Sequence, residues 1–185
     1  MHKVASDDQK SGVIEVRIRE LAQLFNSFDP SPFHDRDLDQ DAEEHIVGWA
    51  RELPVNVPLA IVIHLPEAEA LKARRRDLPQ AMRHYFDVRA DRLGGDLKEL
   101  FRLGRHYLLI GLSILIVCLL ASQFAESYLG PGPLAKTVEE SLIIVGWVAN
   151  WKPLETFLYD WWPVKRRLDL YRRLAAADVR ITATP

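Results

Sequence analysis

The stretch YLLIGLSILIVCLLASQF, residues 107–124, decides the fold of this chain because it contains no charged side chain. As a helix its 18 residues would extend about 27 Å, close to the roughly 30 Å hydrocarbon thickness of a bilayer. The alternative is a buried core helix in a soluble protein, which would need protein cover on every side. A chain of 185 residues offers too little surrounding protein for that, so the stretch predicts a transmembrane helix.

Charge is distributed unevenly around this helix, although the formal net charge is only −2. Residues 1–71 carry a net charge of −8, whereas residues 72–106 carry +5 and residues 165–185 carry +4. Basic residues beside a span favour the cytoplasmic side, so the amino-terminal end of the first span is predicted to be cytoplasmic. The acidic stretch 126–140 contains Gly and Pro and predicts a short loop on the far side.

A second apolar segment, residues 141–151, has only 11 residues and is too short to span a bilayer alone. A helix that continues to residue 162 is long enough, and aromatic and basic residues then follow as an interfacial anchor. The competing interpretation ends the membrane segment near Asn150 and lays residues 153–162 in the interface as an amphipathic helix. We favour a span over about 140–162, because a segment ending at Asn150 would need irregular backbone inside the membrane.

Polar residues in this second span are the most informative positions if the span forms. They are Asn150, Lys152, Glu155 and Asp160. Ionisable groups in a membrane helix are costly and usually face water or a partner, so one interpretation is an ion or proton path, or a polar seam for assembly. In the interpretation that we favour, Lys152 reaches the headgroups and pairs with Glu155, three residues further along the helix.

The rest of the chain predicts a small α+β cytoplasmic domain with a short β-sheet. Hydrophobic patterning indicates three strands, at residues 13–19, 59–65 and 179–183. Because the third strand lies near the carboxyl end, we expect the two ends of the chain to share one sheet. Helices are predicted over residues 20–28, 41–53, 67–76 and 78–93, the last of them stopped by Gly94 and Gly95.

Three parts of the chain follow from these elements. Residues 1–106 form the cytoplasmic α+β domain with its juxtamembrane basic helices. Residues 107–162 form a transmembrane helical hairpin, with spans at about 107–124 and 140–162. Residues 163–185 form a cytoplasmic basic tail that packs back on the domain.

Basic side chains near the spans are expected to bind anionic lipid headgroups, each with about 1 kcal/mol. They are Arg74, Arg75, Arg76, Arg102, Arg105, Lys165, Arg166 and Arg167. A nucleic-acid partner is not predicted, because acidic residues interrupt the basic block and no stacking platform accompanies it.

The densest polar cluster is HDRDLDQD, residues 34–41. Its alternating carboxylates resemble a calcium loop, but Gln40 stands where that loop needs Gly, and Ile46 where it needs Glu. Acids at Asp37 or Asp39 are more typical of a helix cap. Weaker candidates for a divalent metal site are His34, Asp37, Asp41 and His45. No catalytic residue and no cofactor is predicted.

Two segments, DPSPFHDRDLD (29–39) and KPLETFLYDWWPVKRR (152–167), resemble an uncharacterised group of small bacterial inner-membrane proteins. The similarity covers most of the chain. It implies a bacterial inner membrane and brings no established activity, cofactor or catalytic residue.

The leading functional hypothesis is a membrane-anchored interaction or assembly module, not an enzyme, with both termini in the cytoplasm. Its partners would be the lipid bilayer and either another protein or further copies of this chain. One alternative is an oligomeric channel or transport element that uses the polar residues of the second span. A second alternative is a membrane-associated, metal-dependent enzyme.

Overall fold

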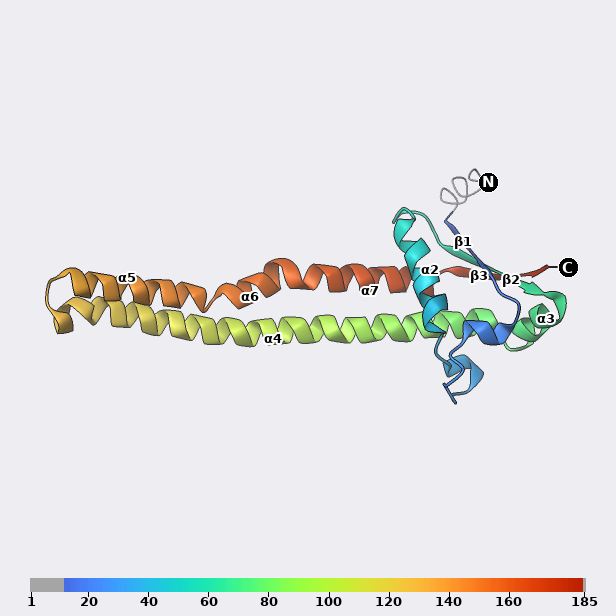
Figure 1. Cartoon of the computed structure of the whole chain (residues 1–185), viewed down its shortest axis with the longest axis horizontal. Helices are drawn as coiled ribbons and strands as arrows, with labels where there is room; N and C mark the ends of the chain where they lie inside the picture. The colour runs from blue at the N-terminus through green and yellow to red at the C-terminus, as the bar shows by residue number, and fades with distance from the viewer. Residues whose placement is uncertain (1–11, 185) are drawn as a thin grey trace. The chain divides into compact units, whose positions relative to one another are not determined.

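The computed structural model describes residues 12–184, and only the backbone of residue 126. The chain is mostly helical, with one small parallel sheet (Figure 1). It divides into two compact units, which we call the sheet unit (Met1–Leu93 with Arg166–Pro185) and the helical unit (Gly94–Lys165). The predicted division at residues 106 and 162 into cytoplasmic, transmembrane and tail parts stays a prediction, and residues 1–11 of the predicted domain lie outside the described part.

The sheet consists of three parallel strands in the order β1-β2-β3. They are β1 (Val13–Arg17), β2 (Ala60–Pro66) and β3 (Asp178–Thr184). One face is buried, since Ile14, Ile61 and Ile63 are at most 1% exposed. The prediction that both ends of the chain share one small sheet is confirmed, because β1 and β3 both pair with β2.

Within residues 12–184, four short helices also belong to the sheet unit. They are the 3-10 helices η1 (Leu21–Leu24) and η2 (Phe33–Asp35) and the α-helices α2 (Gln40–Glu52) and α3 (Glu67–Arg75). Asp39 caps α2 by accepting a hydrogen bond from the Asp41 N–H, as its position before an acidic first turn predicts. The predicted helix over 20–28 is wrong beyond η1, because Phe28 is 93% exposed and cannot complete an apolar side.

Helix α4 (Leu78–Leu129) is continuous over 52 residues, so the predicted stop at Gly94 and Gly95 is wrong. Each glycine costs about 1 kcal/mol in a helix, which is too little to break one that is propagated from both sides. Among residues 12–184, α4 is the one helix that is long and apolar enough to cross a membrane. Only 22% of its most apolar window is buried within the chain, which is unlike the core helix of a soluble protein.

The second apolar segment is helical but interrupted. It comprises α5 (Pro133–Val148), α6 (Trp151–Glu155), the π-helical turn η3 (Thr156–Asp160) and α7 (Trp161–Ala175). The break at Ala149 and Asn150 has a local cause, since Pro153 has no N–H and its ring excludes the carbonyl four residues earlier. The predicted helix therefore continues past Asn150 as expected, but it is not a regular α-helix over 140–162.

Candidate functional site

A stripe of small side chains runs along α4 in the helical unit. Gly104, Gly111, Cys118 and Ala125 recur at every seventh position, and all four are buried. Residues with this period lie on one side of a helix, and small residues allow two helix backbones to approach closely. The seven-residue spacing is present in the sequence, but it does not stand out in a segment whose other residues are also mostly apolar.

Close contacts between α4 and the following helices leave no room for larger side chains on this stripe. A Cβ atom added at Gly111 would lie 2.8 Å from the Ala149 carbonyl oxygen and 2.8 Å from the Asn150 Oδ1 atom. From the other side, a Cβ atom at Gly146 would lie 3.3 Å from the Cys118 Cβ atom. The two helices therefore pack backbone against backbone.

Asn150 is the polar centre of this contact and is only 7% exposed. Its Nδ2 group donates to the Gly111 carbonyl oxygen and to the Gly146 carbonyl oxygen, both at 3.0 Å. Both amide hydrogens are thus used, one within its own segment and one across to α4. The arrangement makes Asn150 a link between the two helices.

The charged candidates form a triad on the surface of the helical unit. The Lys152 Nζ atom lies 3.2 Å from the Glu155 Oε2 atom and 3.2 Å from the Asp160 Oδ2 atom. In a regular α-helix, residues eight apart are about 80° apart around the axis. The wider turn of η3 brings Asp160 back toward Lys152, and the Thr156 hydroxyl donates to the Asp160 Oδ2 atom at 3.3 Å.

The contacts also fix the level of the triad along α4. Asn150 lies beside Gly111, and a Cβ atom at Gly104 would lie 3.1 Å from the Thr156 Cγ2 atom, so the segments run antiparallel. Counting along both helices places Glu155 level with about residue 105 and Asp160 level with about residue 101. Of the four polar candidates, Asn150 therefore lies deepest beside the apolar run of α4.

All eight basic residues expected at the membrane surface are exposed: Arg74, Arg75, Arg76, Arg102, Arg105, Lys165, Arg166 and Arg167. Two of these side chains also make contacts within the sheet unit. Arg74 donates to the Ile181 carbonyl oxygen at 3.3 Å, and the Arg76 guanidinium lies 5.5 Å from the centre of the Phe33 ring. Lipid binding by these residues stays a prediction.

The structure does not gather the residues that were considered as metal ligands, His34, Asp37, Asp41 and His45. Among residues 12–184 it brings together no group of three or more His, Cys, Asp and Glu side chains that could hold a metal ion. His34 packs edge-on against Phe33, with ring centroids 5.9 Å apart. Asp41 and His45 instead line a groove beside β1.

A polar hub that the sequence did not suggest centres on Glu43 of α2. Tyr85 of α4 donates to the Glu43 Oε2 atom at 2.8 Å, and Tyr171 of α7 donates to the Oε1 atom at 2.6 Å. The Arg89 Nη2 atom lies 3.3 Å from the Oε2 atom. The Glu43 side chain is only 15% exposed, so the hub ties three helices of the sheet unit together around a mostly buried carboxylate.

Burial, followed by the hydrogen bond to Glu43, raises the pKa of Tyr171 from 10.0 to about 12, and the same causes raise the pKa of Tyr85. Because the folded pKa exceeds the unfolded one, the stabilisation is present below about pH 10 and is lost as the pH rises toward 12. We expect a titration of tyrosinate absorbance to show Tyr85 and Tyr171 ionising above the ordinary tyrosine pKa of 10.0. Tyr171→Phe should remove absorbance from the high-pH end of the titration, and a loss of absorbance near pH 10 instead would contradict the hub.

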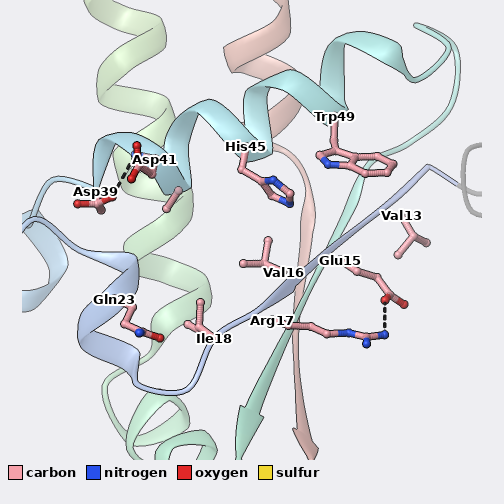
Figure 2. Close-up of a pocket in the computed structure, with 11 residues that line it drawn as sticks. Val13, Glu15, Val16, Arg17, Ile18, Gln23, Asp39, Asp41, His45 and Trp49 are labelled. Atoms are coloured by element: carbon pink, nitrogen blue, oxygen red, sulfur yellow. Dashed lines mark hydrogen bonds and ion pairs between the residues drawn. The ribbon is translucent and has the colours of Figure 1, made fainter. Parts of the chain in front are cut away.

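The groove in the sheet unit has a volume of about 700 Å³ and runs between α2 and β1. Figure 2 shows that His45 and Trp49 point from α2 toward β1. Trp49 lies at the Val13 end of the groove, whereas Asp39 lies at the other end, with Gln23 and Ile18. Its volume falls within the range of small-ligand sites, roughly 300–1,000 Å³.

Comparison of the chain with protein-family models, with curated proteins and with solved structures gives no match.

Proposed function

We propose that this chain is a two-pass membrane anchor that holds an interaction domain, the sheet unit, at the cytoplasmic face of a bacterial inner membrane. The observation that carries the proposal is the packing of α5 and α6 against the apolar run of α4, with Asn150 hydrogen-bonded at the contact. Polar groups can be buried in hydrocarbon at low cost only when they are hydrogen-bonded in this way.

The outward side chains of the helical unit support the same proposal. Several apolar side chains of this unit are each between 59% and 66% exposed. Examples are Leu109, Ile110, Val117, Ile144, Trp147 and Val148. An apolar surface of this extent on a water-soluble protein would cause aggregation, whereas lipid tails would cover it. We infer that this surface faces lipid.

The level of the charged triad fits an interfacial position. Glu155 and Asp160 lie level with the part of α4 that carries Arg102 and Arg105, at the start of the apolar run. Lysine and acidic side chains at that depth can reach the headgroups, and mismatch of the short second segment is tolerated at modest cost. The channel alternative has less support, because Asn150 uses both amide hydrogens in helix contact.

A cross-linking experiment tests the anchor. Gly146→Cys would place a Cβ atom 3.3 Å from the Cys118 Cβ atom, close to the roughly 3.5–4.5 Å of natural disulfides. The same Cβ atom would lie 2.8 Å from the Leu115 Cδ1 atom, the end of a flexible side chain that must shift to admit it. We expect an oxidant to form an intramolecular disulfide in native membranes, because α5 lies beside α4 there. Gly132→Cys, in the turn before α5, should not cross-link to Cys118.

Gly132→Cys also tests the topology. We expect an impermeant maleimide to label it from the periplasmic side of intact cells. Labelling that requires permeabilised membranes, or failure of the Gly146→Cys disulfide, would refute the two-pass anchor.

A further inference from the structure

β1 is an edge strand, and no strand pairs with its outer side among residues 12–184. The Ile18 N–H donates to the His64 carbonyl oxygen of β2 at 3.1 Å, immediately after β1 ends. Backbone groups alternate in direction along a strand, so successive residues face opposite edges. The N–H and C=O groups of Glu15 and Arg17 therefore point away from β2, toward the free edge.

The groove lies along this edge, with α2 as its outer wall (Figure 2). β1 has five residues, an extended length of about 17 Å. A free strand edge, a helix alongside it and a groove between them are a geometry in which an extended peptide can add a strand to a sheet. Main-chain hydrogen bonds then supply affinity, and the wall side chains supply specificity.

The charges of the groove define the peptide. The Glu15 Oε2 atom lies 3.4 Å from the Arg17 Nη2 atom, so these two charges compensate each other. Asp39 and Asp41 form no ion pair with a cationic side chain in the described part of the chain, which leaves this end negative. The opposite end offers the indole of Trp49, an apolar contact surface.

We propose that the groove binds an extended segment of a partner protein, which adds as a fourth strand beside β1 and points a basic side chain toward Asp39 and Asp41. An apolar side chain of the same segment packs on Trp49. The eight positions from Asp41 to Trp49 cover about 12 Å of helix, equivalent to about four residues of strand. The basic and apolar residues therefore stand four apart, on one face of the segment.

This inference rests on the proposed function, because it names the class of partner that the anchored sheet unit takes. The probe is a fluorescent peptide, Leu-Thr-Val-Thr-Lys-Thr-Val-Thr-Leu. Its Lys stands four residues from a Leu on each side, so the peptide fits the groove in either chain direction. Its controls carry Glu in place of Lys, or Pro in place of both Val, which removes backbone donors. Binding is measured by anisotropy with the full chain in lipid nanodiscs.

We expect the lysine peptide to bind and both control peptides to bind at least about tenfold more weakly. Asp41→Lys should weaken binding by about tenfold, whereas Glu44→Lys, on the same helix but outside the groove, should change it less than about twofold. Glu15→Pro should abolish binding, because it removes an N–H from the free edge. Unchanged hydrogen-exchange protection of the β2 amides verifies that each variant is folded.

Three outcomes would overturn the inference: no binding of the lysine peptide, equal binding of the glutamate peptide, or a dimer of the chain that Glu15→Pro dissociates. The last would assign the edge to a second copy. The disulfide that the Gly146→Cys variant forms with Cys118 tests the anchor independently of peptide binding. A chain that forms the disulfide but binds no peptide refutes the groove alone, and the reverse refutes the anchor alone.

Discussion

Replacing Glu43 with alanine is expected to lower the free energy of unfolding of the sheet unit by about 3 kcal/mol. The substitution leaves the hydroxyls of Tyr85 and Tyr171 and the Arg89 guanidinium without their shared acceptor. Loss of one partner from a mostly buried charged network costs more than the network contributes, because the remaining groups stay desolvated.

Hydrogen exchange of the β2 amides in the detergent-solubilised full chain measures this effect, since β2 is the central strand. The expected loss corresponds to exchange on the order of 100-fold faster. Glu44→Ala is the matched control: Glu44 is exposed and accepts a hydrogen bond from the Gln40 side chain, so its loss should cost less than about 0.5 kcal/mol. Equal effects of the two variants would contradict a structural role for the hub.

Replacing Gly111 with leucine is expected to separate α4 from the segment around Asn150. The added Cβ atom alone would come within 2.8 Å of the Ala149 carbonyl oxygen, and a backbone atom cannot move aside cheaply. Overpacking costs about 1–3 kcal/mol, and loss of the Asn150 bond adds about 0.6–1.7 kcal/mol. We therefore expect the yield of the Gly146→Cys to Cys118 disulfide to fall by about tenfold or more.

Gly94→Leu is the control for this variant, because nothing lies within 4 Å of a Cβ atom at Gly94. It replaces a glycine of the same helix, so it should leave the disulfide yield unchanged and slightly favour the helix. Undiminished cross-linking in Gly111→Leu would mean that the two helices do not pack at this stripe.

Local patterns were sufficient to predict the sheet and the first apolar helix. The alternation that buries Ile14 beside exposed Glu15, and the continuous apolar run of β2, follow directly from which faces are covered. Local rules failed at Gly94 and Gly95, where the helix continues because a modest propensity penalty does not outweigh cooperative propagation.

The candidate sites could not be predicted in full, because the residues that form them are far apart in the sequence. Asn150 was identified as an informative polar residue, but its acceptor on Gly111 is 39 positions away and is set by packing. Tyr171 reaches Glu43 across 128 positions, so no local pattern around Glu43 indicates the hub. The groove likewise depends on how α2 passes over β1, which neither segment encodes alone.

The pairing of β2 with β3 has a consequence for biosynthesis. Ala60 pairs with Asp178, so the central strand waits for a neighbour that the ribosome makes only after α4 to α7. Closing so long a loop is slow, and in the two-pass anchor that we propose the intervening helices enter the membrane before it occurs. Until then β2 presents an unpaired edge, which makes a nascent chain that stalls before residue 178 a substrate for chaperones or for aggregation.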